Sequence, residues 1–334
     1  MKVDILKLLL QAHTEGDEPS FRKAALQLAA SESSAGHVRV AEELRAIIAK
    51  LPPTKNAAPA MTTARNTTIV DIATPRGDLA DVLQGRHPDE RFRDIVLPAS
   101  IRALLERIIA ENRARARLEA FGVSPRRRLL FHGAPGCGKT LAAAVLAGEM
   151  GLPLMTVRFD ALFSRFLGAT AVQLRTIFAE MPKRPGVYLF DEFDAVAKAR
   201  GDSQDVGEMN RVVTSFLQLV DADQSGSVLV AATNHVELLD RAVFRRFDTI
   251  VPFEKPSIDE AAALMQLRLE HLGATKEFAS SFATALVGAS FADVTRVCDD
   301  AVRNMVLDGR ELLANDDVTQ AIGHLQQRSM PTGF

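Results

Sequence analysis

The segment that most constrains the fold is HGAPGCGKT at residues 132–140, which follows an apolar run and precedes an Ala-rich helical stretch. Gly133, Gly138, Lys139 and Thr140 have the spacing G-x4-G-K-[S/T]. Glycines let backbone N–H groups wrap around phosphate oxygens, and the following helix points the positive end of its dipole at them. Lys139 is expected to neutralise the β and γ phosphates, and the Thr140 hydroxyl to bind Mg²⁺. The segment predicts a site for ATP and Mg²⁺, although an ordinary Gly-rich turn is the alternative.

Short apolar runs alternate with helical segments from about residue 94 onward. The runs are RRLLFHG, LPLMTVRF, GVYLFDE, SVLVAATN and TIVPF. Strands that are apolar on both faces and separated by helices indicate a parallel sheet covered on both sides. We therefore expect an α/β fold of the P-loop NTPase type, a parallel sheet with flanking helices.

The pattern along the chain predicts four parts. Residues 1–51 carry apolar positions at helical spacing and predict an N-terminal helical bundle, while residues 52–67 are rich in Pro, Ala, Thr and Asn and predict a flexible linker. The α/β domain with its lead-in covers residues 68–255. Residues 256–334 predict a small helical lid domain, which opens on a capping box in the segment SIDE.

Two acids, Asp191 and Glu192, end the predicted strand GVYLFDE. At the carboxyl end of a parallel strand they face the same crevice as the phosphates. Asp191 is expected to hold Mg²⁺ through water, and Glu192 to act as general base toward the attacking water. Two acids at a strand end also fit a solvated loop. Their position 51 to 53 residues after Lys139 and Thr140 favours the nucleotide site.

Further polar candidates follow the next strand. Asn234 ends SVLVAATN and can hydrogen-bond the attacking water or the γ phosphate, although a turn or cap residue is the alternative. LDRAVFRRFD then places Arg245 and Arg246 between two phenylalanines. Paired arginines normally form a solvated or salt-bridged face. The functional alternative is an arginine finger delivered across a subunit boundary, an effect worth roughly 10³ to 10⁵ in rate.

In this order GAPGCGKT, YLFDEFD, AATN, FRRFD and GASFADVTRVCDDAVR resemble the classical-clade AAA (AAA+) ring ATPases, over residues 94 to about 328. The chain resembles small bacterial AAA proteins and the subgroup of katanin and the endosomal-sorting ATPases. The resemblance implies Walker B roles for Asp191 and Glu192, sensor 1 for Asn234, and paired arginine fingers for Arg245 and Arg246.

The resemblance also implies the residues that contact the nucleotide. Besides Asp191, they are Ile95, Val96, Gly133, Pro135, Gly136, Cys137, Gly138, Lys139, Thr140, Leu141 and Ala292. SFADV resembles the SGAD motif and places Ala292 beside the adenosine, while we interpret Asp293 as a helix cap after Ser290. Cys137 stands where the family usually has Thr. A helix N-terminus lowers a thiol pKa, so Cys137 could be oxidisable, but we favour a neutral replacement at a variable position.

A candidate pore loop lies in SRFLGATAVQLRTIF. Phe166, Leu167 and Gly168 stand where the resembling ATPases have an aromatic, hydrophobic, Gly loop that lines a central pore. In that position the exposed aromatic ring grips an extended polypeptide. The alternative is that Phe163, Phe166 and Leu167 pack a helix against the sheet.

Composition argues against some partners but leaves a local basic patch as an alternative. The 334 residues include 40 Lys plus Arg and 42 Asp plus Glu, so the net charge of −2 gives no global attraction to nucleic acid or anionic lipid. No apolar run approaches the roughly 18 residues of a membrane span, and charge interrupts MKVDILKLLLQAHTEGDE too soon for a secretion signal. Two cysteines form neither a disulfide framework nor a zinc site. We expect a cytoplasmic protein.

The expected function is an ATP-hydrolysing homo-oligomeric ring, hexameric by resemblance, that unfolds or remodels proteins through its pore. The N-terminal bundle is expected to recruit a substrate or adaptor. Because no H-E-x-x-H or Ser/His/Asp set is visible, any proteolysis must come from a separate protease. One alternative is a nucleic-acid-handling AAA+ loader, which predicts basic pore loops. Another is a nucleotide switch that acts as a scaffold, which could dispense with Glu192.

Overall fold

The computed structural model describes residues 82–157, 167–193 and 206–329. The chain divides into two compact units, Met1–Thr68 and Ile69–Phe334, and all described residues belong to the second. The predicted N-terminal bundle and linker therefore lie outside the described residues, as does Phe166 of the candidate pore loop.

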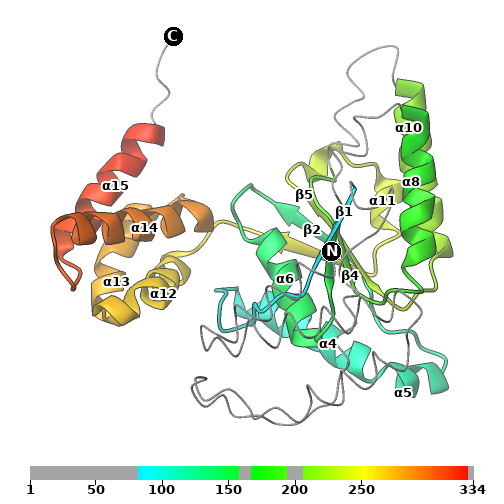
Figure 1. Cartoon of the computed structure of the whole chain (residues 1–334), viewed down its shortest axis with the longest axis horizontal. Helices are drawn as coiled ribbons and strands as arrows, with labels where there is room; N and C mark the ends of the chain where they lie inside the picture. Colours follow the sequence, from blue (N-terminus) through cyan, green and yellow to red (C-terminus); the bar gives the residue numbers. More distant parts are fainter. Residues whose placement is uncertain (1–81, 158–166, 194–205, 330–334) are drawn as a thin grey trace, which may run out of the picture. The chain divides into compact units, whose positions relative to one another are not determined.

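A six-stranded sheet with the order β1-β3-β4-β5-β2-β6 forms the centre of the described α/β region (Figure 1). Its strands are β1 (Leu83–Arg86), β2 (Arg128–Gly133), β3 (Leu154–Val157), β4 (Val187–Phe190), β5 (Val228–Thr233) and β6 (Thr249–Phe253). The strands β2 to β6 pair in parallel, and they correspond to the five apolar runs of the sequence. The predicted α/β parallel sheet is thus confirmed. The strand β1 was not predicted, and it pairs antiparallel with the edge of β3.

Alternate residues of each strand enter two separate cores, which explains why the strands are apolar on both faces. In β2, Leu130 packs into one core while Leu129 and Phe131 pack into the other. In β4, Tyr188 and Phe190 share the core with Leu130, and the intervening positions face the opposite side. The sheet is therefore covered on both faces, as the sequence predicted.

Different helices cover the two faces of the sheet (Figure 1). The helices α4 (Ala99–Arg113) and α6 (Lys139–Met150) supply the core that contains Leu129. The helices α8 (Leu167–Glu180) and α10 (Val206–Ala222) supply the core that contains Leu130. The shorter helices α5 (Arg115–Ala120) and α11 (Arg241–Phe244) precede β2 and β6.

Residues after β6 form a helical group with its own core. It consists of α12 (Ile258–Leu269), α13 (Lys276–Ala283), α14 (Phe291–Leu307) and α15 (Asn315–Ser329). Its core includes Met265, Val294, Ala301 and Val318. Both predicted capping interactions are present, since the Ser257 hydroxyl accepts from the backbone of Glu260 and the Ser290 hydroxyl from the backbone of Asp293. Among the described helices, none combines the length and apolar character needed to cross a bilayer.

Candidate nucleotide site

The loop between β2 and α6 can be formed only with glycine at two positions. Gly133 has φ 141°, and a Cβ there would lie 1.9 Å from the backbone oxygen of Phe253. Gly136 has φ 76°, and a Cβ there would lie 2.8 Å from the Ser290 hydroxyl and 2.9 Å from the Ala292 Cβ. Glycine removes both the steric conflict and the cost of positive φ. The loop can therefore pass close to β6 and to the start of α14.

Lys139 begins α6, and its ammonium lies inside the loop. Its side chain is buried, and Nζ donates to the backbone oxygens of Gly133 at 2.8 Å and Ala134 at 2.9 Å, and to the Asn234 Oδ1 at 2.7 Å. A buried ammonium requires such oxygen partners, because leaving a charge without them costs far more than the roughly 2 to 7 kcal/mol of an unpaired neutral polar group. Lys139 and Asn234, predicted from two separate motifs, are thus in direct contact.

A hydroxyl and a carboxylate meet beside Lys139. The Thr140 Oγ1 donates to the Asp191 Oδ2 at 2.8 Å, and the Asp191 Oδ1 accepts from the Glu192 backbone at 2.9 Å. Glu192 has φ 54° and is the one non-glycine residue with positive φ in the described ranges, a conformation that concentrates at functional sites. Hydroxyl and carboxylate oxygens are the protein ligands that Mg²⁺ accepts. Thr140 and Asp191 therefore fit the ion predicted from the sequence.

These groups line a cavity of about 430 Å³. Its polar lining residues include Lys139, Thr140, Asp191, Glu192 and Asn234. Its other walls contain the predicted Ile95, Val96, Pro135, Gly136, Cys137, Gly138, Leu141 and Ala292. The volume falls within the roughly 300 to 1,000 Å³ of small-molecule sites. Of the predicted nucleotide contacts, only Gly133 is absent from the lining, and its carbonyl instead holds Lys139.

Four residues that the sequence did not indicate also line the cavity: Asp94, Leu264, Phe291 and Thr295. Asp94 and Phe291 are sequence neighbours of the predicted Ile95 and Ala292, which was the available signal. Leu264 and Thr295 occupy ordinary helical positions in α12 and α14, and no motif marks them. The start of α14 is also joined to the loop by a hydrogen bond from the Ala292 backbone to the Gly136 oxygen at 3.0 Å.

Cys137 differs from the reactive thiol that a helix N-terminus could produce. Its side chain is buried, and burial raises the pKa of the thiol although Lys139 nearby opposes this. The hypothesis of a lowered thiol pKa is therefore wrong for this geometry. Burial and the Lys139 charge also lower the pKa of His132, so its imidazole is neutral at pH 7.

The two candidate finger residues lie away from the cavity. Arg245 follows α11 and is exposed, and the Arg246 Nε donates to the Asp221 carboxylate at 2.9 Å. Neither arginine is among the residues that line the cavity, and Lys139 is the one cationic side chain that does so in the described part of the chain.

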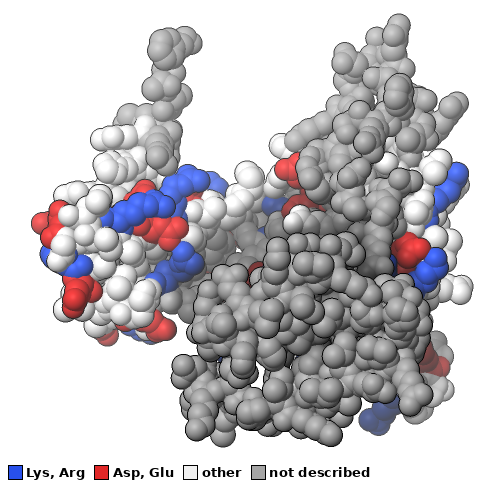
Figure 2. Space-filling model, in the orientation of Figure 1, with Lys and Arg blue, Asp and Glu red and all other residues white. Residues whose placement is uncertain are grey.

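The basic segment RRR at residues 126–128 is engaged within the chain. Arg126 pairs with Glu111 at 2.6 Å, Arg127 pairs with Asp223, and β2 begins at Arg128. Charges of both signs are interspersed on the visible face of the small helical group (Figure 2).

Of the candidate pore loop, Leu167 and Gly168 lie within the described residues, and they form the start of α8.

Comparison with known proteins identifies the family. Residues 129–255 match the ATPase family associated with various cellular activities (AAA). An uncharacterized AAA family ATPase y4kL of Sinorhizobium fredii is 34% identical over 319 residues, which cover 96% of this chain and 94% of that protein. The ATP-dependent zinc metalloprotease FtsH of Burkholderia pseudomallei is 33% identical over 69% of this chain but only 36% of its own length.

The proteasome-activating nucleotidase of Aeropyrum pernix is 31% identical over 77% of this chain and 66% of that protein. The chain therefore spans little more than a third of the FtsH relative and about two thirds of the nucleotidase. The match to the y4kL protein, in contrast, runs along nearly the whole of both chains. Since the family match at residues 129–255 and the 34% identity to an AAA family ATPase over 96% of this chain agree, the chain belongs to the AAA family of ATPases.

Proposed function

We propose that this ATPase works as a homo-oligomeric ring, hexameric as the family resemblance implies, in which Arg245 and Arg246 of one copy complete the nucleotide site of the next. The ring would couple Mg²⁺-dependent ATP hydrolysis to the remodelling or unfolding of proteins. The observation that carries this proposal is the charge balance of the cavity. Lys139 supplies its one cationic side chain in the described part of the chain, while the two finger candidates lie elsewhere.

A triphosphate carries several negative charges, and phosphoryl transfer spreads charge over the transferred group. Catalysis of this step depends mainly on positioning and electrostatic stabilisation. One lysine leaves the transition state short of cationic partners. An arginine from a second copy would supply them, and this requires a heterologous contact between copies.

Within one site, each side chain has a separate role. Lys139 is to exchange the carbonyl oxygens of its own loop for phosphate oxygens, and the loop N–H groups are to bind the phosphates. Glu192 is to accept the proton of the attacking water, and Asn234 to orient that water. Thr140 and Asp191 would hold Mg²⁺, which when bound neutralises phosphate charge and orients the phosphates.

The proposed substrate is a protein. Two of the relatives are named as an ATP-dependent zinc metalloprotease and a proteasome-activating nucleotidase, and these names refer to a protease and to the proteasome. The proposed pore loop, Phe166 to Gly168, would grip the polypeptide. The N-terminal bundle would recruit the substrate or an adaptor in the cytoplasm, and a separate protease is a possible partner. A nucleic-acid loader has less support because Arg126 and Arg127 are paired with acids.

The experiment is steady-state ATP hydrolysis as a function of protein concentration, with light scattering on the same samples. We expect specific activity to rise with assembly in the wild type and to vanish in Glu192→Gln and Arg246→Ala. Arg241→Ala is the matched control, since Arg241 is an exposed arginine of the same segment. Activity that is independent of concentration and survives Arg246→Ala would refute the ring. Glu192→Gln, loaded with ATP, is then tested for retention of casein as an unfolded protein substrate.

A further inference from the structure

The walls of the nucleotide cavity are mostly apolar away from the phosphate loop, α6 and the strand ends. The apolar lining residues there are Ile95, Val96, Leu264, Phe291 and Ala292. Two polar side chains, Asp94 and Thr295, lie among them. A flat, largely apolar ring such as a nucleotide base fits walls of this kind, and the few polar groups in such walls fix its identity and orientation.

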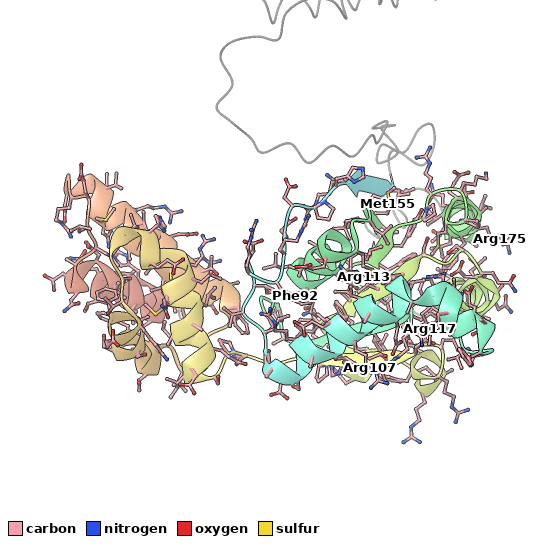
Figure 3. All side chains as sticks on the ribbon, turned by 90° about the horizontal axis from the view of Figure 1, so that it is seen from below. Phe92, Arg107, Arg113, Arg117, Met155 and Arg175 are labelled. Atoms are coloured by element: carbon pink, nitrogen blue, oxygen red, sulfur yellow. The ribbon has the colours of Figure 1, made fainter. Side chains whose placement is uncertain are left out.

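These apolar walls are held in place by the packing of the protein. Ile95 is buried in the core supplied by α4 and α6, whereas Val96 packs against the core of the small helical group. Phe92, labelled in Figure 3, fixes the segment that carries both residues. Its backbone donates to the Glu149 carboxylate at 3.0 Å, and the Arg102 guanidinium lies 5.0 Å from the centre of its ring. A base would therefore meet walls that are already packed.

The Asp94 carboxylate is engaged within its own turn. Its Oδ2 accepts from the Arg91 backbone at 2.8 Å, and its Oδ1 lies 3.7 Å from the Arg93 Nε. The Arg91 carbonyl in turn accepts from the Asp94 backbone at 2.9 Å. Aspartates commonly close turns by such local bonds to the backbone. These bonds explain Asp94 as a turn residue, whereas Thr295 closes no turn.

The hydroxyl proton of Thr295 is already used inside α14. Its Oγ1 donates to the Phe291 backbone oxygen at 2.9 Å, one helical turn earlier. A hydroxyl has one proton and two lone pairs, so after this bond Thr295 offers the cavity an acceptor only. The side chain is half-buried. A ligand that places a donor there gains a hydrogen bond, whereas one that places an acceptor there leaves both groups unpaired.

Thr295 also lies on the side of α14 that faces the nucleotide. The helix is joined to the phosphate loop at Ala292, whose backbone donates to the Gly136 oxygen at 3.0 Å. Thr295 follows three residues later, on the same side of the helix and about 4.5 Å farther along its axis. Both residues line the cavity. Since the loop would bind the phosphates, Thr295 is placed to meet the nucleoside.

We infer that Thr295 selects the base, because its Oγ1 accepts a hydrogen bond from the exocyclic 6-amino group of adenine. Guanine carries a carbonyl oxygen at this position, and that oxygen would face the lone pairs of Thr295. The inference rests on the nucleotide site of the proposed function and adds the residue that makes it a site for ATP rather than GTP. Thr295 is a specificity-determining residue, because it contacts the base and not the reacting phosphates.

The test compares the Kd values of three triphosphates, measured on the full-length chain by competition with a fluorescent ATP analogue. ATP carries the 6-amino group, purine riboside triphosphate carries a hydrogen in its place, and GTP carries the carbonyl oxygen. Every chain carries Glu192→Gln, so that bound nucleotide is not hydrolysed. We expect this parent chain to bind ATP about fivefold more tightly than purine riboside triphosphate, and to bind GTP more weakly still.

Thr295→Val keeps the shape of the side chain and removes the hydroxyl. We expect it to bind ATP about fivefold less tightly than the parent while binding purine riboside triphosphate equally well, so that the preference is lost. Thr295→Ser keeps the hydroxyl and should restore the preference. Thr319→Val is the matched control, because the Thr319 Oγ1 makes the same kind of bond to the Asn315 oxygen at 2.9 Å in α15 but does not line the cavity.

A structural role of Thr295 would affect all three triphosphates alike. Equal losses of affinity for ATP and purine riboside triphosphate in Thr295→Val would therefore overturn the inference. A loss that disappears with 2′-deoxy-ATP would assign the hydroxyl to the ribose and would also overturn it. So would a parent chain that does not distinguish ATP from purine riboside triphosphate.

This test is separate from that of the ring, because it measures binding and needs no hydrolysis or assembly. A chain that selects ATP through Thr295 but hydrolyses it independently of assembly would keep this inference and refute the ring. A ring whose hydrolysis depends on Arg246, but whose Thr295→Val variant keeps the full preference for ATP, would do the reverse.

Discussion

The Arg246 Nε donates to the Asp221 Oδ2 at 2.9 Å, which leaves the two terminal nitrogens of the guanidinium outside this bond. The side chains are 37% and 46% exposed, and exposed ion pairs contribute about 0 to 1 kcal/mol to stability. The consequence of this pair is therefore orientation rather than stability. Asp221 orients the Arg246 side chain, which we propose as a finger.

We expect Asp221→Ala to lower kcat by up to about fivefold, because loss of a pair worth at most about 1 kcal/mol leaves the proposed finger less time in the productive orientation. The temperature of unfolding should be nearly unchanged. Steady-state hydrolysis at saturating ATP and thermal unfolding measure the two effects. Glu106→Ala is the control, since it removes a similarly exposed ion pair with Arg102, far from the fingers in sequence. An unchanged kcat in Asp221→Ala would contradict the orienting role.

Asn234→Asp tests the contact between Asn234 and Lys139. The new carboxylate would hold the Lys139 ammonium, now 2.7 Å from the amide oxygen, and would repel the γ phosphate. We expect the Kd for ATP to rise about tenfold or more, which corresponds to roughly 1.4 kcal/mol. Asn234→Ala should lower kcat more than it weakens binding. Fluorescent nucleotide titration and hydrolysis assays compare the two, and equal effects of both substitutions on Kd would argue against this role of the contact.

Cys137 should behave as a structural residue rather than as a redox sensor. Burial raises the pKa of its thiol, so its reactive thiolate is scarce at pH 7.4 and grows only as the pH rises above the ordinary value of 9.0. Alkylation by N-ethylmaleimide, followed by mass spectrometry, should be slow at neutral pH. Cys137→Thr should keep kcat and KM within about twofold. Fast alkylation of Cys137 at neutral pH would refute this prediction.

The small helical group should lose stability in acid through Asp317. The buried Asp317 carboxylate accepts from both terminal nitrogens of Arg310, at 2.7 and 2.5 Å, and this hydrogen bonding lowers its pKa. A lowered folded-state pKa gives stability that is present above the unfolded pKa of about 3.8 and is lost as the pH falls through the lower folded value.

Asp317→Asn should therefore lower the free energy of unfolding at pH 7, and its difference from the wild type should shrink below about pH 4. Denaturant unfolding at several pH values measures this difference. Asp316→Asn is the matched control because Asp316 is the exposed neighbour. A difference that stayed constant down to pH 3 would show that the carboxylate charge is unimportant.

Gly136→Ala tests the contact between the nucleotide loop and α14. Its Cβ would lie 2.8 Å from the Ser290 hydroxyl, so the loop and the helix must separate. We expect ATP binding to weaken at least about tenfold. Gly151→Ala is the control: Gly151 also has positive φ, but a Cβ there meets nothing within 4 Å. Both variants carry the free-energy cost of placing alanine at positive φ. Equal ATP binding by the two variants would therefore exclude a role for the contact between the nucleotide loop and α14.

The sequence predicted the parts of the fold whose signals are local. The runs that became β2 to β6 are apolar on both faces because two cores meet them, and this leaves a continuous apolar pattern. The caps at Ser257 and Ser290 are also local signals, because each joins a serine to an acidic residue three positions later in the chain. The strand β1 was not predicted, because its sequence LQGR contains only one apolar residue and also a glycine. This strand is stabilised by pairing with β3, and no local sequence pattern encodes that pairing.

The candidate site shows the same division. The residues of the nucleotide loop, Asp191 and Asn234 were predicted from motifs, and they lie together in the structure. Leu264 and Thr295 could not be found in this way, because they reach the cavity only through the packing of α12 and α14. Asp221 is likewise an ordinary acid near the end of α10 until Arg246 is placed beside it.

The helix α14 has a mechanical consequence. It is fixed to the nucleotide loop at one end through Ala292 and Gly136, and it ends in the exposed Leu307. Its 17 residues give a rigid rod about 25 Å long. A tilt of about 10° at the loop moves the far end by about 4 Å, which is larger than a hydrogen-bond length. A change in the loop that tilts α14 would therefore move Leu307 much farther than it moves Ala292.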